Sequence, residues 1–472
     1  MRKNINVLKN KVVAVGMIVA LSFGITACGS ATSEEKSSQK KNETQTSKIS
    51  VVLDSNMIKD DETLQKLKDQ FSRYSITVKD VSNSQGMSAD EFTSQGVTTY
   101  LSSYSELIAD KDSGKYADIS GETNKRGYDK TISETVKSMI TDKQEHIVAV
   151  PTPYMYSLAL ICNADLFKNA GIVDEKGNVK LPATWDEVAD DAKKIKEKTK
   201  KAGFAFIGKE DVTGAWHFEN MAWNFKADSL CLNNSDGSYK ANVNSGEVMS
   251  AMEYLKSLKW DKKVMTDAPE NEDFNTLIEK VAKGEVAMSI GATDCIGAYG
   301  DYGMSDDCLA VTAVPAVKGA TPYSMIDGSV VAFSSTATAE QISAAMDCVE
   351  YLGYSPVLNA ASQKELDVTV SNAYLKNAYV FSKLDSLVNP EIAKYKYETL
   401  AQQNSVEVNI DTPAFANAKK LDNFRNDAVK QESELYLTLS KTVENVLKDK
   451  KSDVKELLNS ANKNYQKLLE SK

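Results

Sequence analysis

The sequence predicts an α/β protein with more than one domain, and three observations support this class. From residue 49 onward, short apolar runs alternate with amphipathic segments, an order typical of parallel sheets covered by helices. The chain has 472 residues, a length that suits two or three domains. Its hydrophobic content of 42% is enough for sizeable cores.

The first 27 residues predict an export signal. They contain Arg2, Lys3, Lys9 and Lys11, no acidic residue, and an apolar run over 12–27. That run is shorter than the roughly 20 residues that a membrane-spanning helix needs. The whole chain has a net charge of −10, and without this basic leader the charge is −14. Such an acidic protein has no general attraction for nucleic acid or anionic lipid, so we expect no nucleic-acid partner.

The first elements after the leader form a βαβ unit. Residues 49–53 predict a buried strand, 64–71 a helix and 75–81 a second strand. Residues 95–103 predict a strand that ends in hydroxyl side chains, and 105–116 a helix followed by a turn. The unit favours a parallel sheet covered by helices.

Capping signals place the later helices. Thr184 and Glu187 have the spacing of a capping box, which predicts a helix start. Helices are also expected over 247–260 and 271–283, and Gly284 should end the second of these before a strand over 285–290. Near the end of the chain, Asp453 and Glu456 can cap a helix whose apolar residues form one stripe.

The sequence lacks the motifs of common enzymes. It has only two histidines, His146 and His217, and no H-E-x-x-H motif, G-x-S-x-G elbow or P-loop. His217 lies between two aromatic residues and is expected to form a hydrogen bond rather than bind a metal. We therefore expect no enzyme activity, no catalytic residue, no metal site and no cofactor.

Cys28 follows the sequence Ile25-Thr26-Ala27, which resembles the lipobox of bacterial lipoproteins. This resemblance implies cleavage before Cys28 and a diacylglycerol group on its sulfur, with the polar residues 29–47 as a tether. The alternative is an ordinary cleaved signal with an incidental cysteine. Five cysteines follow, an odd number, so at least one does not pair within the chain. A bridge between Cys295 and Cys308 stays open.

Four stretches together resemble the extracellular solute-binding lipoproteins of ABC sugar importers, the group that includes maltose-binding protein. They recur in the order that the family shows and cover most of the chain after the tether. The stretches are 148–172 with its sequel 181–187 (Leu-Pro-Ala-Thr-Trp-Asp-Glu), 274–292, 314–335 and 443–469.

The resemblance implies a periplasmic-binding-protein-like fold of two α/β lobes, joined by crossing strands and closing on a ligand by hinge bending. It implies a monomer anchored through Cys28 to the outer face of the cytoplasmic membrane. This protein would bind a small solute, a sugar in the first place, and deliver it to the transmembrane subunits of an ABC permease. The expected parts are a signal peptide at 1–27, a lipidated tether at 28–47, an N-terminal lobe at 48–150 plus 316–365, and a C-terminal lobe at 151–315 plus 366–472.

Sugar recognition needs aromatic rings for C–H faces and polar groups for the hydroxyl rim. Loops that follow strands at the interlobe cleft are expected to supply both. The candidates for ligand contact are Asp54, Asn56, Ser102, Tyr104, Tyr154, Tyr156, Trp216, Asp294, Asp327 and Phe415. Structural alternatives stay open, because Asp54 and Asp327 could cap helices and one of Tyr154 and Tyr156 could face the core.

Two departures from the family pattern bear on the ligand. Where the closest sugar binders often carry a stacking tryptophan, this chain has Ala292-Thr293-Asp294, and at a second such place only Phe415 is available. Fewer rings and an extra carboxylate fit a smaller sugar, an amino sugar or a cationic solute better than a long oligosaccharide. A non-sugar solute bound by the same fold is therefore the alternative. The third hypothesis is a lipid-anchored enzyme or adhesin. The sequence shows neither the catalytic set that an enzyme needs nor the repeats that are common in adhesins.

Overall fold

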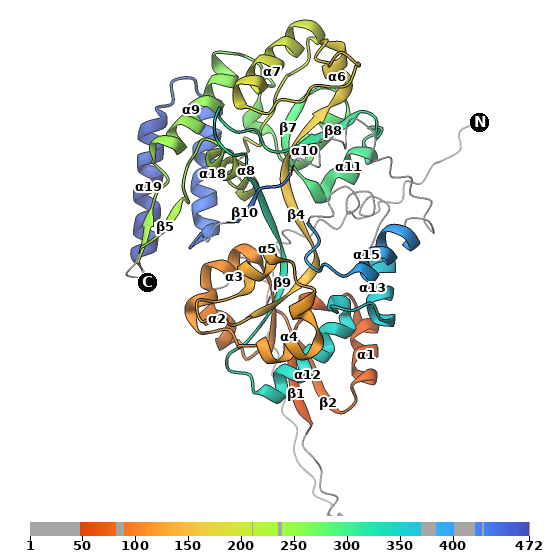
Figure 1. The fold of residues 1–472 in the computed structure, drawn as a ribbon. Helices are drawn as coiled ribbons and strands as arrows, with labels where there is room; N and C mark the ends of the chain where they lie inside the picture. The colour runs from red at the N-terminus through yellow and green to blue at the C-terminus, as the bar shows by residue number, and fades with distance from the viewer. Residues whose placement is uncertain are drawn as a thin grey trace, which may run out of the picture.

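The chain folds into two α/β lobes, which lie below and above one another in Figure 1. The computed structural model describes residues 48–81, 89–209, 211–234, 238–369, 384–400, 421–426 and 429–471. Two long strands, β4 (Ala149–Asn163) and β9 (Ser324–Phe333), run from one lobe into the other. The predicted two-lobed α/β class is confirmed.

The first lobe is built on strands β1 (Ile49–Asp54), β2 (Tyr74–Lys79) and β3 (Thr99–Ser103). β1 and β2 pair in parallel around helix α1, which confirms the predicted βαβ unit. β3 pairs antiparallel with β9, because β9 returns from the other lobe. The helices of this lobe are α1 (Asp61–Gln70), α2 (Ala89–Ser94), α3 (Tyr104–Asp110), α4 (Ser120–Arg126), α5 (Glu134–Ile140), α12 (Ala339–Val349), α13 (Ala360–Thr369) and α15 (Pro390–Lys394).

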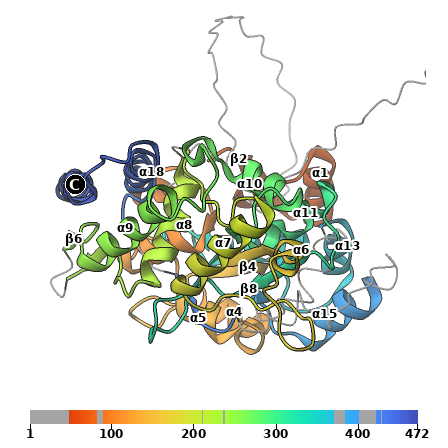
Figure 2. The ribbon, with the colours of Figure 1, turned by 90° about the horizontal axis from the view of Figure 1, so that it is seen from above.

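The second lobe packs helices around the upper half of β4. There β4 pairs antiparallel with β7 (Met288–Ala292) and with β8 (Leu309–Thr312). A small hairpin joins β5 (Cys231–Asn233) to β6 (Tyr239–Ala241). The helices are α6 (Ala164–Asn169), α7 (Trp185–Thr199), α8 (Val212–Trp223), α9 (Gly246–Trp260), α10 (Phe274–Ala282), α11 (Ile296–Asp301), α18 (Glu432–Lys448) and α19 (Val454–Glu470). α18 and α19 pack together as a hairpin at one edge of the lobe (Figure 2).

Short helical turns complete the description. They are η1 (Ser55–Met57), η2 (Lys111–Ser113), η3 (Tyr128–Lys130) and η6 (Glu350–Tyr354), then η8 (Tyr395–Leu400), all in the first lobe, and η4 (Pro269–Asn271) and η5 (Thr293–Cys295) in the second. β10 (Phe424–Arg425) pairs in parallel with the start of β9, so residues 421–426 approach the lobe crossing a third time.

Local capping chemistry sets the helix starts that the sequence predicted. Thr184 and Glu187 form the capping box of α7, and Asp453 accepts a hydrogen bond from the backbone N–H of Glu456 at the start of α19. Gly284 follows α10 with a φ of +66°, in the left-handed region that glycine adopts without a Cβ clash. These predictions succeed because each depends on residues within one turn of helix.

Contacts favour lobe limits that differ from the expected ones in two segments. Residues 316–323 pack in the second lobe. Ala316 forms an isolated β-bridge with Thr184, and the backbone N–H of Tyr323 donates to the side chain of Asn224. Residues 384–400 pack on the first lobe, where Leu387 forms an isolated antiparallel β-bridge with Ile132. The expected limits assigned each segment to the opposite lobe. Residues 316–323 directly precede β9, so that lobe limit falls at the crossing strand itself.

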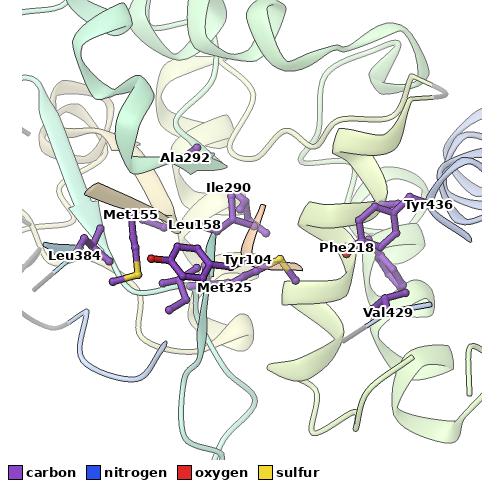
Figure 3. Close-up of a cluster of buried hydrophobic side chains, with 14 of the residues drawn as sticks. Tyr104, Met155, Leu158, Phe218, Ile290, Ala292, Met325, Leu384, Val429 and Tyr436 are labelled. Atoms are coloured by element: carbon purple, nitrogen blue, oxygen red, sulfur yellow. The ribbon is translucent and has the colours of Figure 1, made fainter. Parts of the chain in front are cut away.

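One buried apolar cluster extends through both lobes and the crossing strands. Figure 3 draws part of it, with Tyr104 from α3, Met155 and Leu158 from β4, Met325 from β9 and Ile290 from β7. A continuous packed core therefore supports the residues at the crossing. Within the described ranges, no helix combines the length and the apolar character that crossing a membrane requires.

Candidate functional site at the lobe crossing

An aromatic pair lies where the strands cross between the lobes. Tyr156 on β4 is directly opposite Asp327 on β9 in the antiparallel ladder. Its ring meets the ring of Trp216 on α8 edge to face, with centroids 5.9 Å apart and planes at 77°. Both side chains are half-buried, so each keeps some surface open to solvent. The structure thus brings together three of the predicted residues from three distant parts of the chain.

Asp327 ties the first lobe to the crossing strand. Its Oδ1 accepts hydrogen bonds from the backbone N–H of Tyr104 at 3.1 Å and of Gly328 at 2.8 Å, and its Oδ2 accepts one from Ser105 Oγ at 3.1 Å. The side chain is 8% exposed, and burial raises its pKa to about 6 although these hydrogen bonds lower it. A carboxylate has roughly four acceptor positions, so one stays open to a further donor.

Two more carboxyl groups act electrostatically on Tyr156. Burial raises the pKa of Tyr156 well above its usual value, and the negative charges of Asp327, Asp294 and Glu432 raise it further. Asp294 belongs to η5, and Glu432 is the first residue of α18. We call Tyr156, Trp216, Asp294, Asp327 and Glu432 the crossing cluster.

All three carboxyl groups of the crossing cluster have raised pKa values. Desolvation is the main cause for each, and for Glu432 the charges of Asp327, Glu219 and Glu106 add to it. The residue Asp294 is nevertheless exposed to solvent, although protein atoms surround its carboxyl group. A carboxyl group with a close cation partner has a lowered pKa instead. The crossing cluster is therefore an electronegative environment that suits hydroxyl or ammonium donors.

The other predicted residues of the first lobe serve its own structure. Asp54 is fully buried, and its carboxylate accepts from the backbone N–H of Asn56 at 2.9 Å and of Leu101 at 3.1 Å. This placement favours the capping alternative for Asp54, while Asn56 is exposed beside it. Ser102 is 4% exposed and donates to Glu106 at 2.8 Å. The side chain of Tyr104 is fully buried, and only its backbone contacts Asp327.

Some predictions fall on parts that the structure does not describe. Cys28 and Phe415 lie outside the described residues, and so does the side chain of Tyr154. Cys295 and Cys308 are described, and each is a free thiol. The possible bridge between them is therefore not formed.

Sequence reasoning missed Glu432 and Ser105 as residues of the crossing. Ser105 donates to Asp327 and also contacts the amide of Asn426 beside β10. Behind Glu432, the hydroxyl of Tyr436 donates to Glu219. The sequence signal for Glu432 was available, since an acidic residue opens an amphipathic segment there, but nothing local shows that this helix begins at the crossing.

A polar recess of about 500 Å³ lies elsewhere, on the first lobe around Ser120, Lys137 and Glu145. None of the predicted residues lines it, and it belongs to one lobe alone. Among the described residues, no group of three or more His, Cys, Asp or Glu side chains could hold a metal ion. The crossing cluster therefore remains the candidate site.

A family comparison bears on this arrangement. The family model of the bacterial extracellular solute-binding proteins matches residues 54–353, well over half of the chain. The chain belongs to this family. The match includes β4, β9, Tyr156, Trp216, Asp294 and Asp327 of this solute-binding protein, but ends before Glu432.

Solved structures support the same fold. The maltose-bound MalE3 of T. maritima is 16% identical with a TM-score of 0.57, and the alignment covers 89% of this chain and 100% of that one. A solute-binding protein from Thermotoga lettingae bound with α-D-tagatose is 16% identical with a TM-score of 0.60, covering 90% and 100%. UgpB from Mycobacterium tuberculosis, in complex with glycerophosphocholine, is 12% identical with a TM-score of 0.59, covering 90% and 99%. No curated protein matches the chain by sequence.

Replacing His217 with glutamine is expected to make this solute-binding protein more resistant to acid. His217 follows Trp216, is 1% exposed and donates through Nδ1 to the carbonyl of Thr213 at 2.7 Å. Burial lowers its pKa from 6.5 to about 4. The unfolded chain therefore takes up this proton first, and the native state loses stability as the pH falls from 6.5 to 4, by about 2–3 kcal/mol.

Urea unfolding at pH 7 and pH 4 measures this effect. His217→Gln should lose less stability than the natural protein between the two pH values, because glutamine does not titrate. The half-buried His146 provides the control, as His146→Gln. Equal acid sensitivity of His217→Gln and the natural protein would show that His217 does not resist protonation.

Proposed function

We propose that this protein captures a carbohydrate between its two lobes and delivers it to the transmembrane subunits of an ABC permease. The observation that carries the proposal is the crossing cluster, in which the rings of Tyr156 and Trp216 pack together, Asp327 pairs with Tyr156 on the neighbouring strand, and the charges of Asp294 and Glu432 act on Tyr156. Rings bind the C–H faces of a sugar, and carboxylates accept from its hydroxyls. Capture by hinge closure involves no covalent step.

Relatives of the same fold support a polyhydroxylated ligand. The solved neighbours include proteins in complex with maltose, tagatose, ribitol and mannitol. The modest number of rings at the crossing favours a ligand of one or two sugar units. Asp327 already accepts three hydrogen bonds from within the protein. Most ligand contacts are therefore left to the other members of the crossing cluster, which are Tyr156, Trp216, Asp294 and Glu432.

A cationic solute or amino sugar is the second candidate. Three carboxyl groups with raised pKa values favour it, because a ligand ammonium would supply the compensating charge. The neighbour in complex with glycerophosphocholine shows that this fold accommodates a ligand other than a sugar.

A thermal-shift screen separates the two candidates. A ligand that binds only the folded protein raises its melting temperature by mass action. We expect mono- or disaccharides such as maltose to raise it, and matched pairs such as glucose and glucosamine to reveal any preference for an amine. Stabilisation by a polyamine but by no saccharide would contradict the carbohydrate proposal.

We also propose that the protein is a monomer anchored by lipid on Cys28 to the outer face of the bacterial cytoplasmic membrane. The lipobox-like Ile25-Thr26-Ala27 and the basic leader support this anchor. Acyl chains on the N-terminal peptide, detected by mass spectrometry, would agree with it. A membrane fraction in which Cys28 is a free thiol would contradict it.

A further inference from the structure

Two helix ends from different lobes meet in an ion pair away from the crossing strands. Asp110 is the last residue of α3 in the first lobe, and Lys430 precedes α18 in the second. The carboxylate of Asp110 binds the ammonium of Lys430. The two side chains are 18% and 25% exposed, so solvent and salt screen the pair only in part.

Each partner is held firmly by its own lobe. The Oδ2 of Asp110 accepts from the backbone N–H of Ala89 at the start of α2, at 3.0 Å. The backbone carbonyl of Lys430 accepts from the hydroxyl of Tyr465 on α19 at 2.5 Å, and its ammonium lies 5.3 Å from the ring centroid of Tyr239 on β6. A rotation of the lobes that separates the two charged groups would therefore also strain or break these contacts.

The lobes are joined covalently at β4, at β9 and near β10, where a hinge has to bend. The pair of Asp110 and Lys430 is a noncovalent contact between residues 320 positions apart. We propose that Asp110 and Lys430 form an interlobe latch that holds the lobe angle and so sets how readily the protein closes on its ligand. A ligand binds most tightly to molecules at one particular lobe angle. Its apparent affinity therefore rises or falls with the fraction of molecules at that angle.

The latch deepens the proposed capture by lobe closure, but its test needs no ligand. Small-angle X-ray scattering of the ligand-free protein reports the mean lobe separation through the radius of gyration. The variants are Lys430→Met, which keeps the apolar stem against Tyr239, and Asp110→Asn, which keeps an acceptor for Ala89. Each is measured at 20 mM and at 1 M NaCl.

A matched control uses an ion pair within one lobe. Lys209 and Asp273 are 3.3 Å apart, both in the second lobe, so Lys209→Met removes the same charge without touching the latch.

We expect both latch variants to raise the radius of gyration in low salt, and the double variant to add nothing further. High salt should widen the natural protein toward the variants, because it screens the pair. A partly exposed pair of this kind changes populations by up to about fivefold. Scattering curves and salt responses equal to those of the natural protein and of Lys209→Met would overturn the latch. A screen in which no saccharide binds would contradict the carbohydrate proposal and leave this result standing.

Discussion

Trp216→Ala is expected to weaken saccharide binding at least tenfold, which corresponds to about 1.4 kcal/mol. Trp216 is half-buried on α8, and its ring packs edge to face against Tyr156 at 5.9 Å. Removing it takes away a face for the sugar and also frees the ring of Tyr156, whose pairing contributes about 0.5–1.5 kcal/mol. Truncation of a tryptophan in a binding site often causes one of the largest losses of binding free energy. Isothermal titration with the best saccharide of the screen measures the change.

Trp260→Ala is the control for this experiment. Trp260 ends α9 in the same lobe, is half-buried, and donates from Nε1 to the carbonyl of Val446 at 2.9 Å. Its loss should lower the melting temperature without changing affinity. If Trp216→Ala also lowers only the melting temperature, Trp216 is a core residue and the aromatic pair is not a ligand surface.

Asp327→Ala is expected to lower the free energy of unfolding by about 3 kcal/mol and to abolish ligand binding. The change leaves the backbone N–H groups of Tyr104 and Gly328 without their acceptor in a buried place, and each such loss costs about 1–3 kcal/mol. It also releases the start of α3 from the crossing strand, which disturbs the alignment of the lobes. Urea unfolding and titration calorimetry measure the two effects.

Asp327→Asn separates the hydrogen bonds of this side chain from its charge. Asparagine still accepts from the two backbone groups, so stability should stay within about 1 kcal/mol of the natural protein near pH 4. The pKa of Asp327 is raised to about 6 from an unfolded value near 4, so its ionisation destabilises the native state as the pH rises from 4 to 6. At pH 8 the variant should therefore gain about 2–3 kcal/mol relative to the natural protein.

The control for both changes is Asp453→Ala, which removes an exposed capping carboxylate of α19. It should cost about 1 kcal/mol at both pH values and leave binding intact. A pH-independent difference between Asp327→Asn and the natural protein would contradict the raised pKa. Normal ligand affinity in Asp327→Ala would show that the contact between α3 and β9 does not align the site.

The parts of the fold that sequence reasoning predicted well depend on neighbours along the chain. The βαβ unit of β1, α1 and β2 follows from the alternation of apolar runs, and α7 from its capping box. The antiparallel pairing of β3 with β9 could not be predicted in this way. It exists because β9 returns from the second lobe, so that Ser102 pairs with Val330, 228 positions later in the chain.

The candidate site shows the same division. Residue chemistry pointed to Tyr156, Trp216 and Asp327, and the structure places these three together. Asp54 carried the same chemistry, yet it lies buried with both oxygens bound to backbone groups. Sequence does not distinguish these two fates, because each aspartate stands in an apolar run that forms a strand: Asp54 at the end of β1 and Asp327 inside β9. The tertiary structure decides the difference, because β9 crosses between the lobes and pairs Asp327 with Tyr156, whereas β1 stays within the first lobe.

By itself, the sequence determined the class of the protein, its helix starts and its family, because these depend on local periodicity, capping and ordered motifs. The tertiary structure alone decided which residues meet between the lobes. Tyr156 finds Asp327 through strand pairing, while Glu432 reaches the same place from the end of a helix near the C-terminus. Contacts of this kind depend on how the packed lobes are oriented. The free energy of that packing is spread over many buried side chains, so no single sequence position reveals it.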